Sequence, residues 1–214
     1  TGAMIMGTNH SLIENNKFKD NNQNVNAQGL LLYDVHQSTV KDNVIENNRV
    51  GIYMEDSSRN TITSNRLSTN FIGAQIKNIH QNKLEHNSFL GNVSEMLALS
   101  GKNNVIQNNY WDGAWRLDTN GDGKSNLPYQ SDPFFLNLIE ETPEYQLFFH
   151  DPGMILLQKM LKSPEKKLIK DESPLMNNGF RTERQANKNL TSAWVLSIVM
   201  IMGSFLMIVK GRKR

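Results

Sequence analysis

A repeat of 22 residues runs through the first half of the chain and limits what it can fold into. Its clearest marker is a column of asparagines, Asn43, Asn65, Asn87 and Asn109. Two further columns keep the same spacing: Ser38, Asn60, Asn82 and Asn104, and then Gly29, Gly51, Gly73 and Glu95. Three columns in phase over four periods indicate a solenoid in which each repeat forms one turn.

Each repeat also carries short apolar pieces at fixed places. Around each anchor the sequence follows the pattern N-x-(V/I/L)-x-x-N-x-(I/L/F/W), as in residues 60–67 and 82–89. Residues 11–18 follow a similar pattern, displaced by a five-residue insertion between Phe18 and Gly29. Repeat-like sequence is thus present from the start of the chain, and we expect a C-terminal fragment of a longer solenoid.

The period predicts a right-handed parallel β-helix, with about 22 residues per rung, over residues 1–112. Helical repeats run longer and avoid asparagine, a poor helix former, and leucine-rich repeats need more leucine than this repeat supplies. Rungs stack about 4.8 Å apart, so equivalent residues form ladders. The predicted inward columns are Val40/Ile62/Leu84/Ile106, Ile45/Leu67/Phe89/Trp111, Leu30/Ile52/Ala74/Met96 and Leu32/Met54/Ile76/Ala98.

Asparagine is the outlier of the composition, since 21 of the 28 asparagines precede Tyr110. Asparagine tolerates left-handed backbone and bonds to stacked neighbours, so we expect the repeated ones to line solenoid corners. The absence of cysteine excludes a disulfide framework, a thiolate zinc site and a cysteine nucleophile. A net charge of +2 argues against bulk nucleic-acid binding.

The first candidate metal site follows the last rung. Residues 118–126 read D-x-N-x-D-G-x-x-N, which gives Asp118, Asn120, Asp122 and Asn126 the spacing of calcium-loop ligands. Position twelve of the loop is Tyr129 instead of the bidentate glutamate of an EF-hand. The sequence therefore leaves two interpretations, an isolated calcium loop and a plain Asx-rich turn.

The second candidate metal site is a corner of the solenoid. His36 and His80 share a column two rungs apart, and the rung spacing puts about 9.6 Å between them. Asp34 and Asp56 stack in a second column on the same corner. Copper(I) favours imidazole and thioether ligands, so this edge is a candidate contact for transient copper. A solvated corner is the alternative, and most of the methionines are explained by packing.

Residues 113–176 are punctuated by proline and rich in aromatic residues. A short helix is expected from Pro152, with Met154 and Leu157 on its apolar face. The segment is expected to cap the open end of the solenoid, to dock a partner, or to do both. The candidate partner-binding residues are Phe134, Phe135, Phe148, Phe149, Met154 and Leu157.

The C-terminal part predicts a membrane anchor. Residues 177–189 are polar and form a linker, and residues 190–209 contain no charge and are long enough to cross about 30 Å of hydrocarbon as a helix. The basic residues 210–214 follow at once, so the positive-inside rule places this tail in the cytoplasm and the solenoid across the membrane. A sorting signal removed by a processing enzyme is the alternative.

The order of these parts resembles the C-terminal half of the NosD family over roughly residues 1–176. The resemblance lies in the asparagine-rich rungs, the Y-W-D motif at 110–112, D-T-N-G-D-G at 118–123, P-Y at 128–129, and D-E-S-P-L-M at 171–176. NosD proteins are periplasmic β-helix proteins needed to mature nitrous oxide reductase. The resemblance therefore implies a parallel β-helix on the periplasmic face of the cytoplasmic membrane.

The resemblance also implies a non-enzymatic role and a set of partners. These are the ATPase and membrane subunits of an ABC transporter, a copper-carrying lipoprotein and nitrous oxide reductase, whose copper–sulfide centre the protein would help to assemble. A polysaccharide lyase or epimerase is the enzymatic alternative, and a carbohydrate-binding protein or surface adhesin is the third. The outward column Glu14/Lys41/Thr63/Glu85/Gln107 mixes signs and neutral residues, which argues against an acid–base active site.

Overall fold

The computed structural model describes residues 1–24, 26–131, 138, 142–148, 153, 160 and 169–179. The chain divides into two units, Thr1–Gly179 and Phe180–Arg214, and every described residue belongs to the first. Among these described residues, no helix is long and apolar enough to cross a membrane. The predicted span at 190–209 and the basic tail at 210–214 lie outside the described residues.

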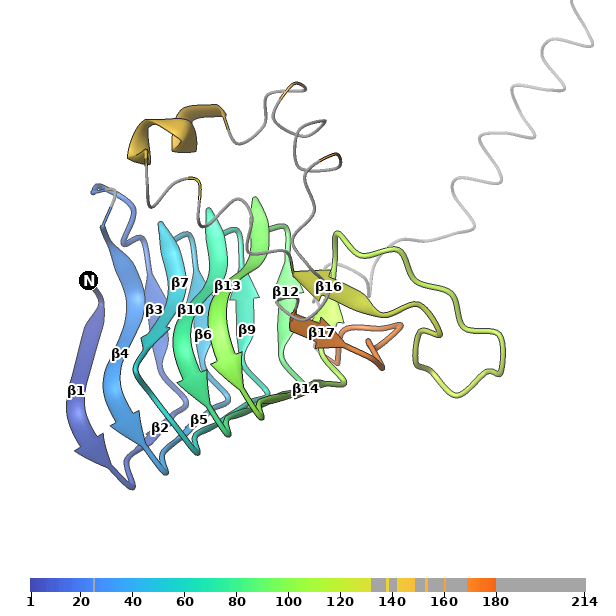
Figure 1. Cartoon of the computed structure of the whole chain (residues 1–214), viewed down its shortest axis with the longest axis horizontal. Helices are drawn as coiled ribbons and strands as arrows, with labels where there is room; N and C mark the ends of the chain where they lie inside the picture. The colour runs from blue at the N-terminus through green and yellow to red at the C-terminus, as the bar shows by residue number, and fades with distance from the viewer. Residues whose placement is uncertain are drawn as a thin grey trace, which may run out of the picture. The chain divides into compact units, whose positions relative to one another are not determined.

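Three parallel sheets of five strands each wind into a solenoid (Figure 1). The first sheet contains β1 (Ala3–Asn9), β4 (Gln28–His36), β7 (Val50–Glu55), β10 (Ile72–His80) and β13 (Ser94–Lys102). The second contains β2 (Leu12–Glu14), β5 (Thr39–Lys41), β8 (Thr61–Thr63), β11 (Lys83–Glu85) and β14 (Val105–Gln107). The third contains β3 (Lys17–Lys19), β6 (Val44–Glu46), β9 (Arg66–Ser68), β12 (Ser88–Leu90) and β15 (Tyr110–Trp111). The prediction of an all-β parallel solenoid is confirmed.

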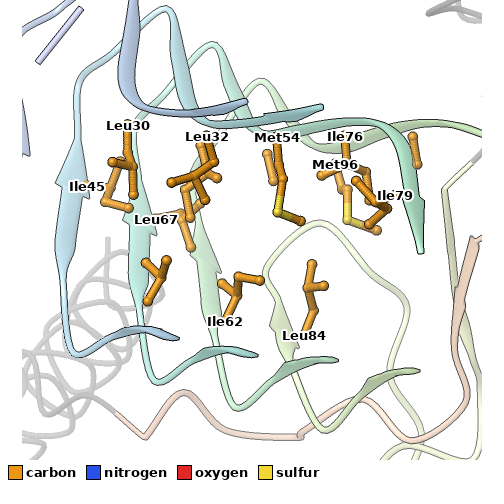
Figure 2. Close-up of a cluster of buried hydrophobic side chains, with 14 of the residues drawn as sticks. Leu30, Leu32, Ile45, Met54, Ile62, Leu67, Ile76, Ile79, Leu84 and Met96 are labelled. Carbon is orange, nitrogen blue, oxygen red and sulfur yellow. The ribbon is translucent and has the colours of Figure 1, made fainter. Parts of the chain in front are cut away.

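The register and the core agree with the sequence repeat. Ile62 pairs with Leu84, and Leu84 pairs with Ile106, each 22 residues further along the chain. All 16 residues of the four predicted inward columns are buried, and Figure 2 shows many of them pointing into the solenoid. Because alternate residues of each strand face inward, even three-residue strands contribute one apolar side chain to this core.

Ladders of polar side chains run along the corners. Asn43 donates its backbone N–H and its side-chain amide to Oδ1 of Asn65, at 3.1 and 2.9 Å. Asn65 makes the same pair of bonds to Asn87, and Asn87 to Asn109. Buried asparagine side chains are therefore fully bonded, which makes their burial tolerable.

The left-handed backbone, however, lies one residue before each asparagine of this ladder. Asp42, Ser64, His86 and Asn108 have φ angles between 54° and 56°. The ladder asparagines are needed for their hydrogen bonds, and their neighbours supply the turn. The expectation that the repeated asparagines form a ladder along a corner is confirmed, and the left-handed positions belong to the residues before them.

The last rung is covered by a two-stranded antiparallel sheet, β16 (Tyr129–Ser131) and β17 (Ile169–Asp171) (Figure 1). The Trp111 ring is stacked between the rings of Phe89 and Tyr129, with centroids 4.2 and 3.9 Å away. Tyr129 thus continues the inward aromatic column beyond the solenoid. A 3-10 helix, η1 (Pro143–Phe148), is the other element described between these strands.

Asp171 ends the central asparagine ladder. Its Oδ2 atom accepts the Asn109 backbone N–H at 2.9 Å, the Asn109 amide at 3.1 Å and the Trp111 indole N–H at 3.0 Å. Its Oδ1 atom accepts the N–H of Ser173 at 3.1 Å. A carboxylate only accepts hydrogen bonds, so it satisfies the last donors of the ladder without offering a donor to a further rung.

The glycine column shows where stacking stops. A Cβ on Gly51 would lie 2.4 Å from the Gly73 carbonyl, and a Cβ on Gly73 would lie 2.5 Å from the Glu95 carbonyl. Each glycine is therefore required by the rung that follows it. Glu95 occupies the same column in the last rung, where residues 112–116 turn away, and its carboxylate accepts the Gly113 N–H.

Candidate functional site

The predicted copper corner forms a chain of hydrogen bonds on the surface. His36 Nε2 lies 2.9 Å from Asp34 Oδ1, and His36 Nδ1 lies 2.8 Å from Ser58 Oγ. Ser58 pairs with His36 in one rung and with His80 in the next, so the two imidazoles are separated by a full rung. Both nitrogens of His36 are engaged, and a metal ion would have to displace Asp34 or Ser58.

The hydrogen bonds that link Asp34, His36 and Ser58 resemble those of a hydrolytic triad, which the sequence alone did not suggest. A triad also needs backbone donors for a developing oxyanion. Near Ser58 these donors are already used, because its N–H bonds to the Val35 carbonyl and that of Arg59 bonds to the His80 carbonyl, both at 3.1 Å. The corner therefore lacks this requirement for acyl transfer.

The ligands that suit copper are dispersed over the described surface. Within the described ranges, no three His, Asp or Glu side chains converge where they could hold a metal ion. Met54 and Met96 are buried in the core (Figure 2), whereas Met4 and Met6 on the outer face of β1 are 58% and 54% exposed. The imidazole and carboxylate groups of the described residues therefore form no resident metal site.

The predicted calcium loop is closed by its own hydrogen bonds. Asp118 accepts the N–H groups of Gly121 and Gly123, at 2.7 and 3.0 Å. Asp122 accepts the Lys124 N–H at 2.8 Å, a bond that lowers the pKa of its carboxyl group. The structure thus shows an Asx-rich turn in which the Asp122 carboxyl group stays ionised, and calcium binding there remains a prediction.

The amide of the fourth predicted ligand also serves the loop itself. Asn126 Oδ1 accepts the Thr119 N–H at 2.8 Å and the Thr119 hydroxyl at 2.7 Å. Asn120 donates its amide to Asp122 Oδ2 at 3.0 Å. All four predicted ligands belong to one hydrogen-bonded turn.

The predicted partner-binding residues fall mostly outside the described residues. The structure does not describe Phe134, Phe135, Phe149, Met154 or Leu157. Most of the helix expected from Pro152 also lies outside the described residues. Phe148 ends η1 and is 49% exposed, so this one aromatic side chain is open to a partner.

The charged residues of this outward column form salt bridges, one within the column and one with a neighbour on the same strand. Lys41 Nζ lies 2.8 Å from a Glu14 oxygen, and Lys83 Nζ lies 2.6 Å from a Glu85 oxygen. The bond from Lys83 lowers the pKa of Glu85, whereas a general acid at neutral pH needs a raised value. This geometry agrees with the sequence argument against an acid–base site on this column.

A titratable cluster that the sequence did not predict lies behind the last rung. Burial raises the pKa of Glu95, and burial together with the charge of Glu95 raises the pKa of Tyr129 well above its usual value. Arg116 opposes the shift at Glu95, and Asp112 adds to it. Desolvation is the largest cause, so the ionised form of Glu95 is the unfavourable one in the fold.

We expect the stability of the protein to rise on mild acidification through this group. The pKa of Glu95 in the folded protein lies above its value in the unfolded chain. The contribution of Glu95 to the free energy of unfolding is therefore fully present below the unfolded pKa, and it is lost as pH rises through the folded pKa. Glu95→Gln keeps an oxygen that can accept the Gly113 N–H and removes the charge. In thermal melts, the Glu95→Gln variant should have a higher melting temperature than wild type at pH 7.5. The difference in melting temperature between the two proteins should be smaller at pH 4.5. An unchanged difference across that range would contradict this account.

Residues 1–133 match the family described as the periplasmic copper-binding protein NosD. The chain belongs to the NosD family. The match covers all five rungs and continues through the loop to β16, the strand that supplies Tyr129. A search of curated proteins gave no match.

Two features of this NosD protein had weak or no signals in its sequence. Asp171 lies 62 residues after Asn109, outside any repeat, so the spacing gives no sign that it ends the ladder. Glu95 broke the glycine column, and this exception was a usable sign that the rung before Gly113 is the last.

Proposed function

We propose that this protein is a non-catalytic accessory factor for nitrous oxide reductase, which helps to assemble the copper–sulfide centre of that enzyme. The observation that carries the proposal is the match to the NosD family over residues 1–133. Copper is then the cargo of the pathway, which agrees with the described imidazole and carboxylate groups, since these do not gather into a resident site.

The geometry of the solenoid supports a scaffold better than an enzyme. Glu14 pairs with Lys41 across rungs, and Lys83 pairs with Glu85 along one strand. The backbone N–H groups nearest Ser58 in the Asp34–His36–Ser58 chain are already bonded and are not free to bind an oxyanion. A lyase or epimerase needs a base and charge-neutralising groups that converge on substrate. Depolymerisation of an acidic polysaccharide by the purified protein would overturn this part of the proposal.

The proposed location is the periplasmic face of the cytoplasmic membrane. Residues 190–209 form the anchor in this proposal, and residues 210–214 remain in the cytoplasm because of their positive charge. Such an anchor keeps the solenoid beside an ABC transporter, a copper-carrying lipoprotein and the reductase on the same side.

Docking on the transporter is assigned to the aromatic segment between β16 and β17. Its four phenylalanines exceed what a small cover for one rung needs, and aromatic side chains often dominate interfaces. Phe148, the one with a described environment, is half exposed.

Replacing these four phenylalanines with alanine should abolish co-purification of the protein with the transporter subunits. The residues to change together are Phe134, Phe135, Phe148 and Phe149. Circular dichroism should still report a folded solenoid, because the predicted core columns contain none of the four. Tyr33→Ala is the matched control, since Tyr33 is an aromatic residue 38% exposed on the outer face of β4, and it should retain the transporter. Retention by the fourfold variant would disprove this docking assignment.

A further inference from the structure

The loop between β15 and β16 carries an exposed apolar cluster. Trp115 is 88% exposed, and Leu117 and Leu127 are 50% and 42% exposed. The Asn126 N–H bonds to the Leu117 carbonyl at 2.7 Å, which brings the two sides of the loop together and places the leucines on neighbouring segments. A tryptophan this exposed, on the same loop as two half-exposed leucines, is a sign of an interaction site.

Neighbouring contacts hold Trp115 in this outward position. Arg116 turns inward, donates to the Trp111 carbonyl at 2.6 Å and lies over the Tyr110 ring at 4.4 Å. On the other side, the Gly113 N–H is bonded to Glu95. Trp115 is therefore presented by a segment that is fixed at both ends.

The chain passes this same loop as it runs towards the proposed anchor. The Ser125 N–H bonds to the Pro174 carbonyl at 2.7 Å, and the Met176 N–H bonds to the Gly123 carbonyl at 3.0 Å. Figure 1 shows the loop and the residues after β17 together at the end of the solenoid opposite β1. The proposed span starts at Leu190, 14 residues after Met176, and a chain of that length reaches at most about 50 Å.

The charges of the loop favour a neutral apolar contact over an electrostatic one. Residues 112–127 contain three acidic and two basic side chains, so the loop has no basic excess for anionic headgroups. Tryptophan suits the boundary between hydrocarbon and water, because its ring is apolar and its N–H can remain hydrated.

We propose that Trp115, with Leu117 and Leu127, inserts into the lipid interface of the membrane that holds the chain's own anchor. This inference rests on the proposed anchor at 190–209. The contact gives the solenoid a second attachment and fixes its last rung against the membrane, so that the first rung points away from it.

The test uses the fluorescence of the full chain reconstituted in phosphatidylcholine bilayers. The chain has three tryptophans, of which Trp111 is buried and Trp194 lies in the proposed anchor. A Trp194→Phe variant leaves Trp111 and Trp115, and a second variant that also carries Trp115→Phe gives the Trp111 background. Subtracting the emission of the second variant from that of the first gives the emission of Trp115. Lipids brominated near the headgroup should quench most of this emission, and aqueous acrylamide should quench little of it.

A tryptophan at the far end of the solenoid provides the matched control. Leu12 in the first rung is 57% exposed, and Leu12→Trp in the background lacking Trp115 and Trp194 should be quenched by acrylamide and not by brominated lipid. Raising the phosphatidylglycerol content should leave the Trp115 signal unchanged.

If the protein floats with the bilayers while Trp115 remains open to acrylamide, the lipid contact is wrong and the anchor stands. If Trp115 becomes shielded only when the transporter is added, its partner is a protein, which also overturns the proposal. Failure of the protein to float would refute the anchor itself.

Discussion

Leu67→Asp is expected to abolish folding of the solenoid. Leu67 is fully buried in the third sheet, where it pairs with Ile45 on one side and Phe89 on the other. An unpaired carboxylate in such a core costs more than about 4–5 kcal/mol. Since natural domains have about 5–15 kcal/mol of stability in total, we expect loss of the cooperative unfolding transition in urea.

Val105→Asp is the control for this change. Val105 lies in β14, in the last rung of the same solenoid, and is 46% exposed on the outer face. The same aspartate there should shift the urea midpoint only slightly. A wild-type-like midpoint for Leu67→Asp would show that the inward columns are wrong.

Asp171→Ala should produce the second largest loss of stability. The change leaves the Asn109 backbone N–H and the Trp111 indole N–H without an acceptor in a buried site. The Asn109 amide keeps its bonds to the carbonyls of Leu84 and Gln107. Two buried donors left unsatisfied cost about 2–6 kcal/mol in the free energy of unfolding, which urea titration measures.

Asp171→Asn separates the hydrogen bonds from the charge. The asparagine keeps one oxygen for the ladder, as each earlier rung does, and its amide faces the Ser173 N–H, which loses its acceptor. The loss should therefore be smaller than for Asp171→Ala. Equal stability of the alanine variant and wild type would mean that Asp171 does not end the ladder.

The solenoid could be predicted from the sequence because its restraints are local and repeated. A side chain such as Leu67 is buried for the same reason as the residue 22 positions earlier, so the sequence shows the same fact several times. The insertion after Phe18 was equally visible, and it appears as a 27-residue offset between Asn16 and Asn43 in their hydrogen bond.

The end of the solenoid could not be predicted in the same way because each of its contacts occurs once. Asp171 reaches Asn109 across 62 residues, and Tyr129 stacks on Trp111 from a strand outside the repeat. For the metal candidates, spacing identified His36 and Asp118 but could not show that both are already bonded to neighbours. Ligand spacing is therefore a weaker guide than the repeat, because neighbouring side chains and N–H groups compete for the same atoms.

The most direct test of the proposed function is the copper content and visible spectrum of nitrous oxide reductase purified from a strain that lacks this chain. We expect the reductase to be made without its copper–sulfide centre, and we expect the wild-type gene to restore the centre. Complementation with His36→Gln should also restore it if copper is cargo that does not reside at that corner. A reductase with a complete copper–sulfide centre in the deletion strain would contradict the account.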